Sequence, residues 1–273
     1  MEDVVALRVT FDTNSLDPVL RPQLFPGNPR NPEFQKINAA LLNRSIEGVF
    51  SETIITIEGI KRADRALVFR GTRLRHNTGE ASVTAEGNAA ISLELVVEQP
   101  ALSPLNPAFA VRVGTAVKLG LRMLRAPRIG ALFIEDPDKT LYVYDADTNA
   151  LAQRQERFHD VLRAIESKGL GFSRLRRMAD EFAERAGVVE PWYKSIGRAN
   201  DIHKKRAVER AFAEWSDADS IAAHIGYGME LFCTEDQGHS GNDPTIFDAV
   251  NRSWLEQTYG TRFVTLSELA AMV

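Results

Sequence analysis

Hydrophobic and polar residues follow strand and helix spacings at the beginning of the chain. Residues 4–11 form a mostly apolar, β-branched run that predicts a strand, and the run stops at the turn-forming residues 12–14. Residues 34–46 have the spacing of an amphipathic helix, residues 49–55 predict a second strand, and residues 56–66 the helix after it. This alternation of strand and helix is typical of a parallel sheet.

The last part of the chain has the same character. Residues 202–215 predict a helix, residues 216–226 a second short amphipathic helix that opens with Asp217 and Asp219, and residues 231–233 an apolar strand. Asp217 or Asp219 is expected to cap that short helix. Further helices are predicted at 154–167, 173–186, 246–258 and 267–272, and a further strand at 262–264.

The pattern changes between these two parts. Residues 91–97 alternate between apolar and polar, which marks a half-buried strand, and residues 81–85 could be its hairpin partner. Residues 107–125 predict a helix, and a second hairpin could join residues 131–135 to 141–144. We therefore expect residues 1–66 and 150–273 to form one α/β domain, with residues 67–149 as an inserted β-rich and helical block.

Composition and charge add three points. The chain has 273 residues, 44% of them hydrophobic, and a single cysteine, Cys233, so it can bury a large core but has no internal disulfide. It contains no apolar run long enough for a membrane span and no signal-peptide pattern, which predicts a cytoplasmic protein without a membrane partner. From residue 211 onward, two arginines stand against ten acids, a charge of −8, so the total of −4 leaves +4 on residues 1–210.

Acidic residues recur where the predicted elements end. Asp12 follows the first strand, Glu58 lies near the start of the next helix, and Asp236 follows the strand at 231–233. The carboxyl ends of parallel strands meet at one edge of a sheet, so Asp12 and Asp236 should lie close together. A carboxylate cluster without cysteine or paired histidine favours a hard cation such as Mg²⁺ or Mn²⁺.

Five segments together resemble the PIN-domain family of nucleases. They cover roughly the first 66 and the last 65 residues. Each segment alone is a weak signal, but their order and their location at the two ends of the chain are together more specific. The segments are FDTN (11–14), TIEGI (56–60), DADSIAAHI (217–225), LFCTED (231–236) and FVTLSEL (263–269).

The resemblance implies a three-layer α/β/α sandwich with a central parallel sheet, and cleavage of single-stranded or structured RNA with Mg²⁺ or Mn²⁺. On this match Asp12, Glu58, Asp217 and Asp236 are catalytic metal ligands, and Asn14 and Thr234 support the site by hydrogen bonding. Two protein partners stay open: a second copy of this chain and, by the habit of the family, an antitoxin-like protein.

Several alternatives remain open at this point. Asp219 could replace Asp217 as the third ligand, and Glu52 is a rival for the second position. The chain could also be a PIN-like binding module that has lost its chemistry. A haloacid-dehalogenase-like phosphohydrolase would require a second acid at position 14, where this chain has Asn14.

Basic residues could hold the phosphates of a nucleic acid. Lys61, Arg62 and Arg65 follow Glu58, with further basic residues up to His76, and additional clusters occur at 174–177 and 204–206. Lys118, Arg122 and Arg125 would share one face of the helix predicted at 107–125. Trp192, Tyr193 and Trp215 could stack on bases, although packing in a core is the more frequent role for such residues.

Overall fold

The computed structural model describes residues 6–61, 64–65, 68–69, 73–83, 89–98, 106–126, 136–238 and 244–273. At its centre is a five-stranded sheet in the order β5-β2-β1-β6-β7, in which every neighbouring pair is parallel. The first and last parts of the chain meet in this sheet, because Val9 pairs with both Gly48 and Leu231. The strands are β1 (Leu7–Phe11), β2 (Ile46–Ser51), β5 (Arg122–Leu124), β6 (Leu231–Cys233) and β7 (Arg262–Val264).

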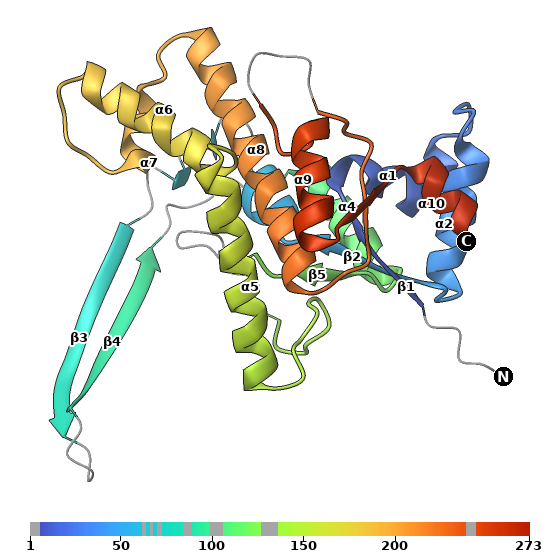
Figure 1. The fold of residues 1–273 in the computed structure, drawn as a ribbon, viewed down its shortest axis with the longest axis horizontal. Helices are drawn as coiled ribbons and strands as arrows, with labels where there is room; N and C mark the ends of the chain where they lie inside the picture. The colour runs from blue at the N-terminus through green and yellow to red at the C-terminus, as the bar shows by residue number, and fades with distance from the viewer. Residues whose placement is uncertain are drawn as a thin grey trace.

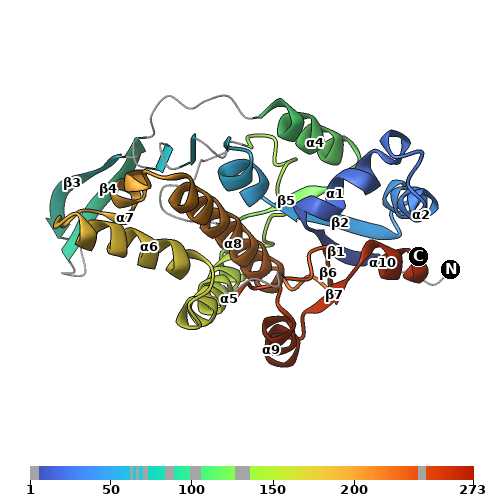
Figure 2. The same cartoon turned by 90° about the horizontal axis from the view of Figure 1, so that it is seen from above.

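Helices cover both faces of the sheet (Figures 1 and 2). Each layer buries an apolar stripe such as Leu16 and Ile37 on one face, or Phe158 and Ile221 on the other. The protein is therefore a three-layer α/β/α sandwich, as predicted. One layer contains α1 (Thr13–Leu20), α2 (Asn31–Leu42), α4 (Pro107–Lys118) and α10 (Leu266–Met272), and the other α5 (Thr148–Ser167), α8 (Ile202–Gly226) and α9 (Ala249–Tyr259).

A third apolar cluster lies beside the sandwich, around the first half of α8. It joins the π-helix η2 (Ile54–Glu58) to α6 (Phe172–Arg185) and α7 (Trp192–Ser195). Trp192 and Trp215 pack against each other there, with ring centroids 5.8 Å apart, so the expectation of core packing is confirmed for these aromatics. The structure also describes two 3-10 helices, η1 (Pro22–Leu24) and η3 (Ile196–Arg198), and helical residues at 64–65 and 68–69.

The inserted region contains the predicted antiparallel hairpin. Strands β3 (Arg73–Val83) and β4 (Ala89–Glu98) pair over most of their length, from Arg73 opposite Glu98 to Val83 opposite Ala89. In Figure 1 the hairpin extends away from the sandwich. Residues 131–135, half of the second predicted hairpin, lie outside the described residues.

The helix predicted at residues 107–125 is too long. Helix α4 ends at Lys118, and Gly120 follows with a φ of 87°, a backbone conformation that favours glycine and ends the helix. Residues 122–124 then form β5, which pairs with β2 at one edge of the sheet. This part of the predicted insertion is thus built into the central sheet.

The break predicted within residues 202–226 is also wrong. Helix α8 runs without interruption for 25 residues and is capped by Asp201, whose side chain accepts from the Lys204 amide. Asp217 and Asp219 therefore cap nothing. Buried residues such as Trp215 and Ala218 hold the middle of the helix against its neighbours, and this packing overrides the local preference of the Ser-Asp-Ala-Asp segment for a helix start.

Two boundaries near Glu58 differ from the sequence prediction. Strand β2 begins at Ile46 rather than at residue 49, and it ends at Ser51. The segment that follows opens with the π-helical turn Ile54–Glu58, where an α-helix over residues 56–66 is predicted; residues 64–65 are helical, and residues 62, 63 and 66 lie outside the described residues. Such turns are frequent at functional sites, and this one carries Glu58 at its end.

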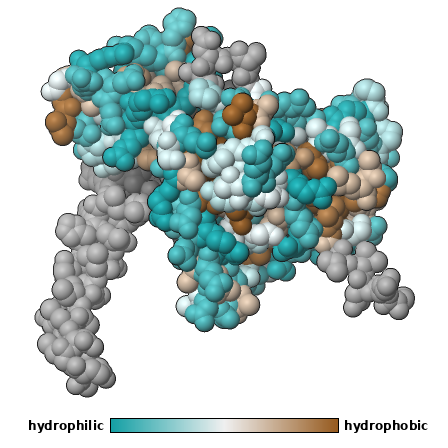
Figure 3. All heavy atoms as spheres, viewed as in Figure 1, coloured by the Kyte–Doolittle hydropathy of each residue, from teal (hydrophilic) through white to brown (hydrophobic). Residues whose placement is uncertain are grey.

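The surface visible in Figure 3 is mostly hydrophilic, with small and separate hydrophobic patches. Among the described residues, no helix combines the length and the apolar composition that a membrane crossing requires.

Candidate active site

A cavity of about 820 Å³ opens at the carboxyl ends of the central strands. Asp12 follows β1 directly, and Asp236 lies three residues after the end of β6. The two ends of the chain thus contribute to one site, as the strand directions predict. Four acids named from the sequence lie in its wall: Asp12, Glu58, Asp217 and Asp236.

Asp12 is held firmly between two elements. It is the N-cap of α1, and its carboxylate accepts hydrogen bonds from the Thr13 amide at 2.7 Å and from the Thr234 hydroxyl at 2.7 Å. Its own amide donates to the Cys233 carbonyl, and only 8% of the residue is exposed. The side chain therefore has little freedom to turn away from the cavity.

Asn14 and Thr234 connect the loop after β6 to α1. The Asn14 side-chain amide donates to the Thr234 hydroxyl at 3.3 Å, and its oxygen accepts from the Glu235 amide at 3.0 Å. The Thr234 hydroxyl also accepts from the Asp236 amide at 3.1 Å. These bonds set the position of Asp236 relative to Asp12.

Glu58 is oriented from α8 and from its own loop. The Ser216 hydroxyl donates to the Glu58 carboxylate at 2.7 Å. The Arg65 guanidinium donates to the Glu58 carbonyl at 2.9 Å and to the Ile60 carbonyl at 3.2 Å. Arg65 therefore stabilises the turn that presents Glu58.

The four acids act on one another electrostatically. Burial raises the pKa of Asp12 to about 7, with further contributions from Glu58 and Asp236, while the bonds from Thr234 and Thr13 act in the opposite direction. Burial also raises the pKa of Asp217 well above its ordinary value. The negative charges of Asp12 and Glu58 raise this pKa further. A bound cation would remove this repulsion.

The carboxylates are not gathered into a finished metal site. Within the part of the chain that the structure describes, no three His, Cys, Asp or Glu side chains stand close enough together to hold one metal ion. The donors in the cavity nevertheless fit a hard cation, because they are carboxylate oxygens that repel one another without it. Binding would therefore require these side chains to draw closer together.

The two rival ligands point elsewhere. Asp219 is 1% exposed and accepts from the Trp215 indole at 3.0 Å, and it does not line the cavity. Glu52 accepts from the Ala126 amide at 2.7 Å, and burial raises its pKa. The geometry thus favours Asp217 over Asp219 and Glu58 over Glu52.

The basic residues named from the sequence are divided among several places. Lys61 and Arg65 line the cavity, and Arg62 lies outside the described residues. The expectation that Lys118, Arg122 and Arg125 share a helix face is wrong, because α4 ends at Lys118.

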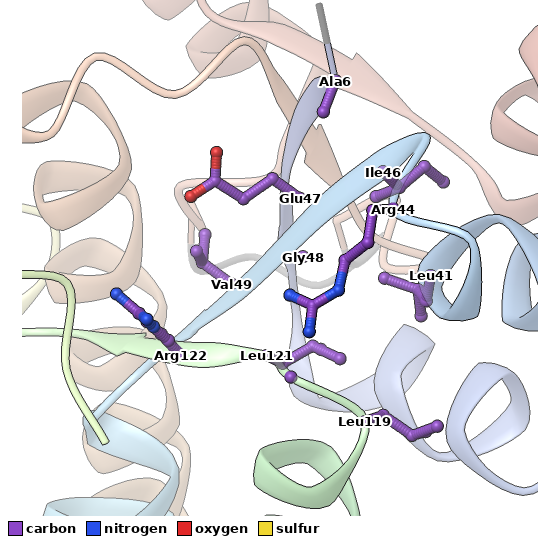
Figure 4. Close-up of a pocket in the computed structure, with 11 residues that line it drawn as sticks. Ala6, Leu41, Arg44, Ile46, Glu47, Gly48, Val49, Leu119, Leu121 and Arg122 are labelled. Atoms are coloured by element: carbon purple, nitrogen blue, oxygen red, sulfur yellow. The ribbon is translucent and has the colours of Figure 1, made fainter. Parts of the chain in front are cut away.

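Arg122 and Arg125 both lie away from the acids. Arg122 begins β5 and lines a different hollow with Arg44 and Glu47, at the amino ends of the strands (Figure 4). The Arg125 guanidinium lies over the Tyr142 ring, 3.8 Å from its centroid. Neither arginine belongs to the cavity wall that contains Asp12.

Other residues of the cavity were not singled out as site residues from the sequence. Phe109 and Arg112 come from α4, and Arg210 comes from α8; Ser216 of α8 is not part of the wall but bonds to Glu58, which is. The position of Arg210 relative to Asp217 follows from the sequence only when residues 202–226 are taken as one continuous helix. Arg206 was noted only as part of a basic cluster, yet it lines the same cavity.

Glu214 is a buried acid one turn before Asp217. Its carboxylate accepts from the Gly171 amide at 3.3 Å and from the Ile246 amide at 3.0 Å. Burial raises the pKa of Glu214 to about 7, the two amide bonds and Arg174 act in the opposite direction, and the charge of Asp248 raises it further. Glu214 thus joins α8 to the loops before α6 and α9.

We expect Glu214→Gln to reduce the loss of stability with rising pH. The folded-state pKa lies above the ordinary 4.5, so the folded protein holds the extra proton between pH 4.5 and 7, and stability falls as pH rises through this window. Glutamine does not ionise, so the variant lacks this fall in the free energy of unfolding, which amounts to about 3 kcal/mol above pH 7. Urea unfolding measures the free energy of unfolding of both proteins at pH 5 and pH 8. If the difference between the two pH values is the same in the variant as in the wild type, the prediction is contradicted.

Ser216→Ala is expected to weaken cation binding without unfolding the protein. It removes the hydrogen bond to the Glu58 carboxylate, and losing such a supporting bond costs about 10- to 100-fold in metal affinity. Calorimetric titration with Mn²⁺ measures the change. Ser220→Ala is the matched control, because Ser220 lies one turn further along α8 and bonds to Thr53 instead; equal losses in both variants would refute a role for Ser216.

The chain was compared with known proteins in three ways. No family model, no curated protein and no solved structure matches it.

Proposed function

We propose that this protein is a divalent-cation-dependent phosphodiesterase that cleaves RNA in the manner of PIN-domain nucleases. The observation that carries the proposal is the convergence of Asp12, Glu58, Asp217 and Asp236 on one cavity from segments far apart in the sequence. Cationic side chains, including Lys61, line the same cavity. Carboxylates beside cations suit a phosphate ester that is held and hydrolysed there.

The four acids would hold Mg²⁺ or Mn²⁺. Such an ion would lower the pKa of a water molecule bound to it and neutralise charge on the phosphoryl oxygens. Thr13 and Thr234 fix the Asp12 carboxylate, and Ser216 fixes that of Glu58. Pre-oriented groups of this kind lower the cost of assembling a reactive geometry.

Hydrolysis forms a bond between the oxygen of water and phosphorus and breaks the bond from phosphorus to the 3′ oxygen. The water loses a proton, and the leaving 3′ oxygen gains one. The products are then a 5′ phosphate and a 3′ hydroxyl. Lys61, which is exposed at the rim, would hold a non-bridging phosphate oxygen.

The direct test uses the wild-type chain with two substrates. We expect Mn²⁺ to support hydrolysis of an RNA oligonucleotide and of bis(4-nitrophenyl) phosphate, and EDTA to stop both. End-group analysis of the RNA fragments should find 5′ phosphates. Hydrolysis that continues in EDTA, or none with Mn²⁺ or Mg²⁺, would rule out this function.

A second candidate is a nucleic-acid-binding module without chemistry. It is favoured by the spacing of the acids, since no three of them in the described residues are already close enough to share an ion. Calorimetric titration separates the two: a chain that binds RNA but takes up no Mn²⁺ would be such a module, whereas Mn²⁺ uptake that Asp12→Asn removes supports the enzyme.

A further inference from the structure

The cavity has an acidic end and a basic end along α8. Arg206, Arg210, Ala213 and Asp217 lie in its wall, and their spacings of three and four residues place them on one face of the helix. Eleven residues separate Arg206 from Asp217, which corresponds to about 16 Å along the helix axis. Glu209 also lines the cavity, between the two arginines in sequence, so this stretch of α8 carries a net charge of +1 at its Arg206–Arg210 end and a negative charge at Asp217.

The basic end of this stripe is available to a ligand. Both Arg206 and Arg210 are exposed, and no ion pair or hydrogen bond of their side chains is found with the described residues. Other exposed arginines of the chain, such as Arg163 and Arg198, do pair with acids. Two guanidinium groups one helical turn apart can bind one phosphate together.

The opposite wall comes from α4, within the predicted insertion. The Arg112 guanidinium lies over the Phe109 ring, 4.8 Å from its centroid, and both residues line the cavity. The Nε atom of Arg112 is buried and forms an ion pair with Asp17 at 3.6 Å, and it has no hydrogen-bond partner among the described residues. An aromatic ring and a further cation thus face the space beside the α8 stripe.

We propose that Arg206 and Arg210 form a subsite for a phosphate of the same strand, one or two nucleotides from the scissile one. This inference rests on the proposed function, because the scissile phosphate must lie at the acidic end. It identifies the preferred substrate as an oligonucleotide with at least one phosphate beyond the cleaved bond. The subsite acts on binding and positioning, and it takes no part in the chemical step.

The test compares two substrates in the variant Arg206→Ala/Arg210→Ala. Bis(4-nitrophenyl) phosphate has no neighbouring phosphate, so its Mn²⁺-dependent hydrolysis should fall far less than that of RNA. For an RNA oligonucleotide we expect KM to rise about 10-fold or more, and the dependence of log affinity on log salt to fall by about 0.7, the value for one single-strand phosphate. Arg176→Ala/Arg177→Ala, on the exposed face of α6, is the matched control.

Fluorescence anisotropy in EDTA measures RNA binding independently of cleavage. Weaker binding by the α8 variant, with wild-type binding by the α6 control, supports the subsite even if neither substrate is hydrolysed; in that case it is the proposed function that fails. Unchanged RNA binding overturns the subsite whatever the hydrolysis assays give. Equal losses on both substrates also overturn it, because they place the arginines in the reaction site itself.

Discussion

Replacing Asp12 by asparagine is expected to abolish Mn²⁺-dependent RNA cleavage while stabilising the cation-free protein. Asparagine is nearly the same size, caps helices well and can still accept from the Thr13 amide, so α1 should remain in place. The lost carboxylate charge weakens cation binding and the stabilisation of the reacting phosphate. We expect cleavage to fall by at least about 1000-fold, which corresponds to roughly 4 kcal/mol in the barrier.

The gain in stability follows from the pKa of Asp12. Burial and the neighbouring acids raise this pKa from 3.8 to about 7, so the ionised carboxylate destabilises the folded state above pH 7 and the penalty disappears below about pH 4. Removing it should stabilise the variant by roughly 2 to 4 kcal/mol at pH 8 without a cation. Thermal unfolding with and without Mn²⁺ measures this, and only the wild type should gain stability from the ion.

Glu52→Gln is the matched control for Asp12→Asn. Glu52 is also a buried acid near the end of a central strand with a raised pKa, but it bonds to the Ala126 amide and does not line the cavity. It should therefore keep full cleavage activity. A loss of activity in this variant, with Glu58→Gln active, would reverse the assignment of the two glutamates.

Gly171→Ala is expected to cost about 4 kcal/mol of folding free energy. Gly171 precedes α6 with φ 60° and ψ −135°, a region that is open almost only to glycine, and strain there costs about 1 to 3 kcal/mol. An added Cβ would also lie 2.8 Å from the Ala218 Cβ, and forcing the helices apart costs about 1 to 3 kcal/mol more. Urea unfolding measures the sum.

Gly187→Ala separates strain from crowding. Gly187 also has a positive φ, 64°, but no atom of the described residues lies within 4 Å of the added Cβ, so we expect a loss of only about 1 kcal/mol. Because Ala218 adjoins Asp217 in α8, the Gly171 variant should also cleave RNA more slowly. Equal unfolding costs in the two variants would show that α6 and α8 are not closely packed at this point.

The parallel sheet and the meeting of the chain ends were predictable from local pattern. The runs that become β1 and β6 are short and apolar, and each is followed directly by polar residues. In a parallel sheet the direction of the strands places those polar residues at one edge. Asp12 and Asp236 therefore face the same cavity for a topological reason that needs no knowledge of distances.

Short elements escaped this kind of prediction. Strand β5 has three residues and follows α4 so closely that its apolar residues extend the helical pattern. The π-helical turn before Glu58 has no sequence signal of its own. Both depend on pairing and packing with distant residues, which the periodicity of a single segment does not contain.

Local pattern predicts four of the five strands, their parallel sense and the edge where the acids gather, because strand periodicity and chain direction are local properties. Which acids face the cavity depends on tertiary packing. Once α8 is one helix, Asp219 is turned about 200° from Asp217 and faces Trp215, while Arg206 and Arg210 join the stripe of Asp217. Packing against α5, α6 and the sheet made that helix continuous, and this choice of helical phase assigned each charged side chain to the cavity or to the core.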